Sequence, residues 1–176
     1  MIGNGTTSTS KDAFNEEIDF LGANINFWSE GASANGLSRY SKRLLELMSD
    51  GALNPIFVKE EFDKEVTKAI EGLKADEKSV TSIARRVENA LTYGKNHYNG
   101  EYVTEETLKN ITLEDVKLNY NTYFVPGNAY LVIVGDVNVK ETKKEVERLF
   151  GKWKKATAPS LSYNDPVDVQ YSQINF

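Results

Sequence analysis

Helical periodicity is the feature that most limits how this chain can fold. Apolar residues recur at three- and four-residue spacing through most of the sequence, as amphipathic helices require. The clearest helix is predicted over residues 59–75, where the apolar stripe consists of Phe62, Val66, Ile70 and Leu73. Weaker stripes with capping residues predict further helices over residues 10–21, 39–53, 79–94, 112–123 and 139–150, and a short one starting at residue 104.

Strand-like patterns are fewer. Residues 23–30 alternate, with Ile25 and Phe27 on one side of a predicted strand. A turn near Glu30-Gly31 leads into a second strand of small residues, 32–37. The two strands are expected to form a hairpin whose backbone other groups can approach closely.

Two more segments complete the predicted sheet. Residues 129–134 are apolar throughout, which indicates a central strand buried on both faces. Residues 167–176 alternate and predict a last strand. We therefore expect an α+β fold, a mostly antiparallel β-sheet with helices packed on it. The 176 residues suit one domain over 1–176, with 156–166 as a linker-like segment before the last strand.

Composition excludes some functions. With 21 basic and 26 acidic residues, the net charge of −5 argues against a nucleic-acid partner, which would need a basic patch. The longest apolar run, 129–134, is far shorter than the roughly 20 residues that span a bilayer. We expect no membrane span and no signal peptide after Met1. The absence of cysteine leaves the compartment open between the bacterial cell envelope and the cytoplasm.

Side chains that could carry catalysis are scarce. The chain has one histidine, His97, and no cysteine, whereas zinc needs three protein ligands. His97 lies in a predicted loop, where it could be a base, a lone ligand or simply a solvated residue. The carboxylates of residues 59–75 alternate with lysines at helical spacing, which is typical of a solvated face. The sequence thus predicts no catalytic residue, no metal ligand set and no cofactor in this chain.

Several motifs nevertheless stand in an order that resembles one peptidase family. They are Asn4-Gly5-Thr6, residues 14–23, 53–57 and 93–97, and above all residues 112–136, which include Tyr123-Phe124-Val125-Pro126-Gly127-Asn128 and Leu131-Val132-Ile133-Val134-Gly135-Asp136. In order and spacing this set is similar to the insulinase, pitrilysin and mitochondrial processing peptidase family of zinc metallopeptidases, the inverzincins. The resemblance covers nearly the whole chain.

The resemblance implies an N-terminal-type domain with the LuxS and processing-peptidase kind of metallopeptidase fold. Active family members bind zinc through H-x-x-E-H, with the glutamate as general base. That motif would fall immediately before Met1, so the chain would lack the first strand or strands and the motif helix. The resemblance therefore implies a fragment or an inactive homologue.

The family's third zinc ligand is a glutamate that follows another glutamate by two helical turns. If Glu65 matches the earlier carboxylate, the ligand position is Gly72. Glu71 is one residue away, about 100° around the helix, and Glu77 would need an altered helix. Glu65 and Glu71 are therefore only weak metal candidates, to be considered if the parent protein is active.

The resemblance also implies how such a domain meets a peptide. In the family a peptide adds as a strand to an exposed sheet edge, through main-chain hydrogen bonds that do not need catalytic side chains. The corresponding residues are Asn24, Ile25, Asn26, Phe27 and Trp28. The alternative is an ordinary hairpin covered by the rest of the domain.

Three functions are consistent with the sequence. The first is a non-catalytic domain that forms part of a peptide-binding chamber with a second homologous domain or subunit, and whose partner is a peptide or an unfolded polypeptide. The second is half of an active zinc endopeptidase whose motif lies upstream of Met1. The third is a dimerisation or assembly module that binds no peptide.

Overall fold

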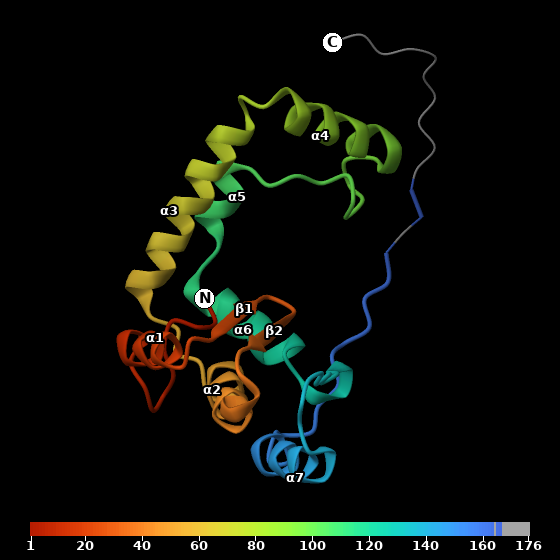
Figure 1. The fold of residues 1–176 in the computed structure, drawn as a ribbon. Coiled ribbons are helices and arrows are strands. Elements are labelled where there is room, and N and C mark those ends of the chain that lie inside the picture. The colour runs from red at the N-terminus through yellow and green to blue at the C-terminus, as the bar shows by residue number, and fades with distance from the viewer. Residues whose placement is uncertain (164, 167–176) are drawn as a thin grey trace. The chain divides into compact units, whose positions relative to one another are not determined.

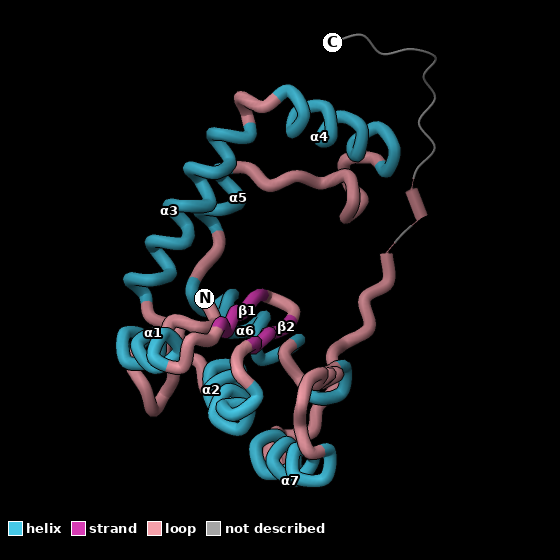
Figure 2. The backbone as a smooth tube through the Cα atoms, in the orientation of Figure 1, coloured by secondary structure: helices cyan, strands magenta, loops and turns pink. Residues whose placement is uncertain are grey.

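A computed structural model describes residues 1–163 and 165–166. Figures 1 and 2 show helices with one small sheet, the α+β class that the sequence predicts. The elements in chain order are α1 Lys11–Phe20, β1 Asn24–Trp28, β2 Gly31–Asn35, η1 Ser38–Tyr40, α2 Ser41–Leu53, α3 Lys59–Asp76, α4 Val80–Tyr93, α5 Glu105–Asn110, α6 Leu113–Tyr123, η2 Pro126–Asn128 and α7 Val139–Phe150. Within the described ranges, no helix is both long and apolar enough to cross a membrane.

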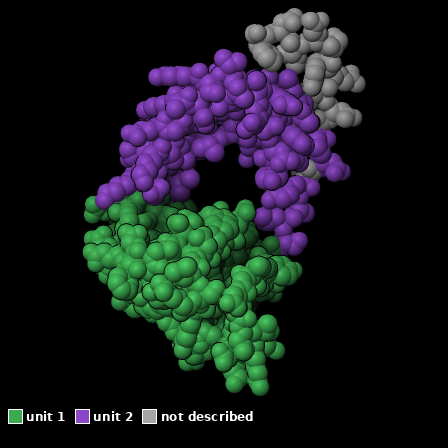
Figure 3. Space-filling view, viewed as in Figure 1, with its two compact units in different colours: residues 1–62, 113–159 green, residues 63–112, 160–176 purple. Residues whose placement is uncertain are grey.

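The chain divides into two compact units (Figure 3). Unit 1 consists of residues 1–62 and 113–159, and unit 2 of residues 63–112 and 160–176. The prediction of one domain over residues 1–176 stays a prediction.

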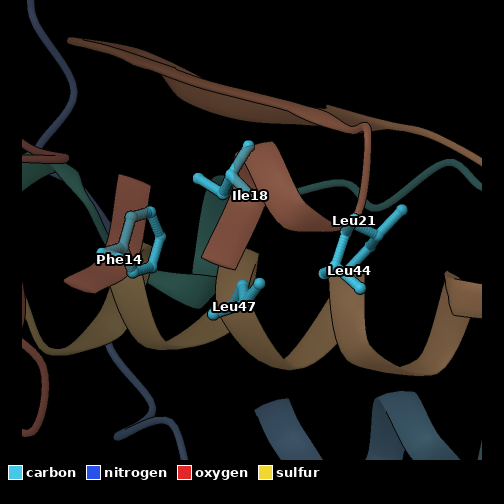
Figure 4. Packing of buried hydrophobic residues seen from close by; sticks show 5 residues of the cluster. All are labelled: Phe14, Ile18, Leu21, Leu44 and Leu47. Atoms are coloured by element: carbon cyan, nitrogen blue, oxygen red, sulfur yellow. The ribbon is translucent and has the colours of Figure 1, made fainter. Parts of the chain in front are cut away.

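The core of unit 1 lies between α1 and α2. Ser10 caps α1 by accepting a hydrogen bond from the Ala13 N–H at 3.3 Å, and Gly22 ends the helix with a φ of 56°. The resulting helix turns its apolar residues toward α2, as Figure 4 shows. The buried cluster consists of Phe14, Ile18, Leu21, Leu44 and Leu47.

The hairpin packs against this cluster. β1 and β2 pair in antiparallel register from Asn24 opposite Asn35 to Trp28 opposite Gly31. Ile25 and Phe27 of β1 pack on the cluster, while the residues between them are exposed. The alternation predicted for residues 23–30 is confirmed.

The N-terminal residues are tied to the end of α2. Thr6 forms a β-bridge with Pro55, and the Thr7 N–H donates to the Asn54 carbonyl at 3.0 Å. The Thr6 side chain is buried, at 4% exposure, and its Oγ1 accepts hydrogen bonds from the Ser8 and Thr9 N–H groups at 3.2 and 3.0 Å. This turn positions the start of α1.

Unit 2 contains most of α3, together with α4 and α5. Ser79 caps α4 through the Ser82 N–H at 3.3 Å, and Gly94 ends it with a φ of 82°. Thr104 caps α5 in a capping box with Thr107. Both ends of α4 and the start of α5 agree with the predicted ones. They could be predicted because capping depends on residues that are close in the sequence.

The predicted central strand over residues 129–134 is wrong. No backbone hydrogen bond joins residues 130–137 to any other part of the described chain, so they form no strand. Tyr130, Val132 and Val134 are 95%, 81% and 92% exposed, and Leu131 and Ile133 are 43% and 37% exposed. A strand is buried only when neighbouring strands and helices cover it, and the described sheet has only β1 and β2. The last predicted strand, 167–176, lies outside the described residues.

The ends of this extended segment are fixed by helical elements. At η2, the Gly127 N–H donates to the Ala156 carbonyl at 2.9 Å, and a Cβ on Gly127 would lie 2.5 Å from that oxygen. On the other side, Asn138 caps α7 through the Glu141 N–H at 3.1 Å. Arg148 of α7 donates to Glu46 of α2 at 2.8 Å. The segment is therefore held in place at both ends, although the described residues pair no strand with it.

Candidate functional site

The edge of β1 is the candidate peptide-binding edge. Residues Asn24–Trp28 pair with β2 on one side, and the described sheet places no strand on the other. Such an edge presents unpaired N–H and C=O groups to which another strand can bind. The structure thus brings the five predicted residues together on one strand.

Tight packing fixes the position of this edge. The Phe27 ring lies 6.2 Å from the Phe14 ring, centroid to centroid. A Cβ on Gly51 of α2 would lie 2.3 Å from Phe27 Cζ, so the ring fits only because residue 51 is glycine. A Cβ on Gly3 would meet the same ring at 2.8 Å. These contacts hold the backbone of β1 before any ligand arrives.

Trp28 ends the edge and is 47% exposed. Its indole lies over Gly31, where a Cβ would be 3.3 Å from Trp28 Cζ2. The side chain is therefore ordered by the hairpin while it still faces solvent. It can report on a ligand that binds beside it.

The weak metal candidates do not form a zinc site. Glu65 and Glu71 are exposed on α3, about 120° apart around the helix axis. Glu65 accepts a hydrogen bond from Lys68 at 3.1 Å, and the space around Gly72 is open. In residues 1–163 and 165–166, no three histidine, cysteine or carboxylate side chains come together to hold a metal. The donors of this part of the chain do not fit zinc.

His97 has a local structural role in unit 2. Its Nδ1 accepts a hydrogen bond from the Asn99 N–H at 3.1 Å, and its ring stacks on Tyr93 at 5.2 Å. Next to it, Tyr98 stacks on Tyr163 at 4.6 Å. These rings line a cavity that the sequence did not predict.

Sequence reasoning also missed a groove in unit 1. Two cavities of about 470 and 430 Å³ are both lined by Ala32 of β2, Met48 of α2, and Tyr130 and Leu131. Because they share these residues, the two cavities are neighbours along β2, and we name them together the β2 groove. The apolar run 129–134 was the only signal for it, and it was interpreted as a buried strand.

Residues 110–175 match the family model described as the peptidase M16 inactive domain. The predicted resemblance to the insulinase-type M16 peptidases is confirmed. No curated protein sequence matches this chain.

Several solved structures are similar over nearly the whole chain. The peptidase M16 inactive domain from Pseudomonas fluorescens superposes with a TM-score of 0.79 at 18% identity, over 95% of this chain and 42% of that one. A protease from Helicobacter pylori gives 0.80 at 18% identity, over 92% and 41%. The first half of the periplasmic protease PqqL from Escherichia coli gives 0.71 at 17% identity, over 95% and 38%. This chain thus spans less than half the length of each of these three structures.

Proposed function

We propose that this chain is a non-catalytic M16-type domain that contributes one wall of a peptide-binding chamber, formed with a second homologous domain or subunit. The observation that carries the proposal is the β1 edge. It has one free side in the described sheet, and its inward residues Ile25 and Phe27 are fixed in the core. A preformed edge lowers the entropy cost of adding a peptide strand.

The comparisons support a polypeptide as the partner. The matching family model is described as an inactive domain, and two of the similar structures are named proteases. Proteases hold their substrates in extended form, and a domain of this fold can keep that ability without catalytic groups. Because this chain matches less than half of each similar structure, a second domain or subunit is proposed as the opposite wall.

The metal donors support the non-catalytic part of the proposal. Glu65 and Glu71 point to different sides of α3, and His97 is engaged with Tyr93 and Asn99. A zinc peptidase needs three convergent protein ligands and an open position for water. The described residues do not supply such a set.

A fluorescence titration tests the proposed edge. In a Trp153→Phe variant, Trp28 is the only tryptophan of the chain. Titration with an unstructured ten-residue peptide should give a saturable change in Trp28 emission. Two control peptides carry methyl groups on alternate backbone nitrogens, one peptide on its odd-numbered residues and the other on its even-numbered residues. Their affinities should differ, because only one of these two sets of N–H groups faces β1. The peptide whose methyl groups block pairing with β1 should bind about tenfold more weakly, or weaker still, than the unmethylated peptide.

Three results would contradict the proposal. The absence of a saturable Trp28 response would favour a pure assembly module. Equal binding of all three peptides would exclude main-chain pairing. Zinc-dependent cleavage of the peptide, lost in Glu71→Gln or Glu65→Gln, would show an active peptidase.

A further inference from the structure

We propose that the loop between α4 and α5 is a proton-sensitive switch, in which protonation of His97 releases the turn formed by residues 97–101. This switch lies in unit 2 and does not depend on the peptide binding proposed for the β1 edge. The chain passes from α4 to α5 through residues 94–104, which form turns and loop (Figure 2). His97 is the only histidine of the chain, and histidine is the side chain that ordinarily gains a charge between about pH 5 and 8.

The backbone of His97 closes this loop. Its N–H donates to the Gly94 carbonyl at 3.1 Å, and its carbonyl accepts from the N–H groups of Gly100 and Glu101 at 2.8 and 2.9 Å. A Cβ on Gly100 would collide with the Gly94 oxygen, so the two ends of the turn meet where only glycine fits. Residues 94–101 therefore form one closed turn around His97.

The side chain of His97 adds a hydrogen bond that depends on its protonation. Nδ1 accepts from the Asn99 N–H at 3.1 Å. A ring nitrogen that accepts carries no proton, so the neutral tautomer that fits this geometry has its proton on Nε2. A second proton would have to bind Nδ1, where it would point at the Asn99 N–H. The protonated ring therefore cannot keep this hydrogen bond.

Packing of the ring allows it to change partners without leaving its place. The His97 ring stacks on Tyr93, the last residue of α4, with centroids 5.2 Å apart and planes inclined by 15°. A half-turn about the Cβ–Cγ bond keeps this stack and takes Nδ1 away from Asn99. Protonation can thus break the hydrogen bond while the ring stays on Tyr93, and the Asn99 N–H then loses its acceptor.

The charged groups around the ring offer the imidazolium new partners. The cavity that His97 lines is also lined by Lys95 and Glu101 of the same loop, and by Asp165. The two carboxylates attract an imidazolium, as does the carboxyl end of α4, whereas the Lys95 ammonium repels it. Phenols ordinarily titrate near about pH 10, well above this range. Those of the cavity belong to Tyr93, Tyr98 and Tyr163.

The loop therefore has two arrangements that a single proton selects. With a neutral ring, side chain and backbone of His97 both hold the turn. With a protonated ring, Nδ1–H turns toward a carboxylate and only the backbone hydrogen bonds remain. The loss of one hydrogen bond, with an N–H left unsatisfied, should raise the open fraction of the turn about tenfold.

Amide hydrogen exchange of the full chain, measured by NMR, tests this switch. After correction for intrinsic exchange, the N–H groups of Asn99, Gly100 and Glu101 should lose protection about tenfold between about pH 7.5 and about pH 5.5. The N–H groups of Ile83 in α4 and Leu108 in α5 are controls, since each donates to a helical carbonyl at 3.0 Å. Their protection should change by less than about twofold. The one imidazole C2–H resonance should titrate over the same pH range.

Two substitutions separate protonation of the ring from other effects of acid. His97→Asn places Oδ1 where Nδ1 lies, and this oxygen accepts from the Asn99 N–H without titrating in this range. The Asn99 N–H should therefore stay protected at both pH values. His97→Gln has its amide one bond further out, so the Asn99 N–H should be poorly protected at both. Circular dichroism should show unchanged helix content in the two variants.

Three outcomes would overturn the inference. One is unchanged protection of the Asn99 N–H between the two pH values. Another is an equal loss of protection in His97→Asn, which would assign the effect of acid to carboxylates such as Glu101. The third is a C2–H resonance that does not titrate between about pH 5 and 8, which would exclude protonation of the ring.

Discussion

At the scale of single residues, one hydroxyl organises the turn that precedes α1. Thr6 Oγ1 accepts from two backbone N–H groups, and its side chain is buried. Thr6→Val keeps the shape but leaves both donors unsatisfied, and should lower the free energy of unfolding by about 1–3 kcal/mol. Urea denaturation measures this loss.

Thr6→Ser is the matched control, because it keeps the hydroxyl and removes only a methyl group. It should lose clearly less stability than Thr6→Val. Equal losses in the two variants would show that the methyl contacts, and not the hydrogen bonds, hold the turn.

At the scale of secondary-structure elements, an ion pair joins α1 to α2. Arg43 donates to both carboxylate oxygens of Glu17, at 2.5 and 2.8 Å. These hydrogen bonds hold the pKa of Glu17 below its ordinary value of 4.5. A carboxylate whose pKa is lowered in the folded state stabilises the fold above its unfolded pKa, and this contribution is lost as the pH falls below 4.5 through the lowered value.

Arg43→Gln should therefore reduce stability at pH 7 by up to about 1 kcal/mol, since the pair is partly exposed. The free energy of unfolding of this variant should also fall less steeply than that of the unmodified protein as the pH is lowered. Urea denaturation at pH 7, 4.5 and 3.5 measures both effects. Lys140→Gln removes the same charge from α7 and should keep the acid dependence of the unmodified protein. An unchanged slope in Arg43→Gln would exclude Glu17 as the titrating group.

The elements also show what sequence reasoning can reach. Helix α7 is predicted over residues 139–150 and found there, because spacing and the Asn138 cap are local. The extended segment 129–134 was interpreted wrongly, because the burial of a strand depends on neighbours from elsewhere in the chain. For the candidate site, alternation was enough to place Asn24–Trp28 on one strand. The close contact of Phe27 with Gly51 and the β2 groove depend on three-dimensional packing, and no local pattern reveals them.

At the scale of the whole molecule, exposed apolar surface and low net charge act together. The sequence pI is about 5.1, so charge repulsion between molecules is weakest near pH 5. The exposed run 129–134 is apolar and lacks proline, a composition that favours intermolecular strand pairing. Val132→Glu should slow aggregation at pH 5 several-fold, as measured by light scattering.

Val139→Glu is the control for this change. Val139 is 79% exposed and Val132 81%, so the two variants carry the same substitution at equal exposure. Only Val132→Glu interrupts the apolar run. Similar slowing in both variants would attribute the effect to net charge alone.

The contact between Gly51 and Phe27 restricts how this sequence can change over time. Any side chain at position 51 would intrude on the aromatic ring, so glycine can be replaced only after the ring has become smaller. In descendants that keep the hairpin in place, substitutions at these two positions should therefore occur in a fixed order, with Phe27 replaced before Gly51.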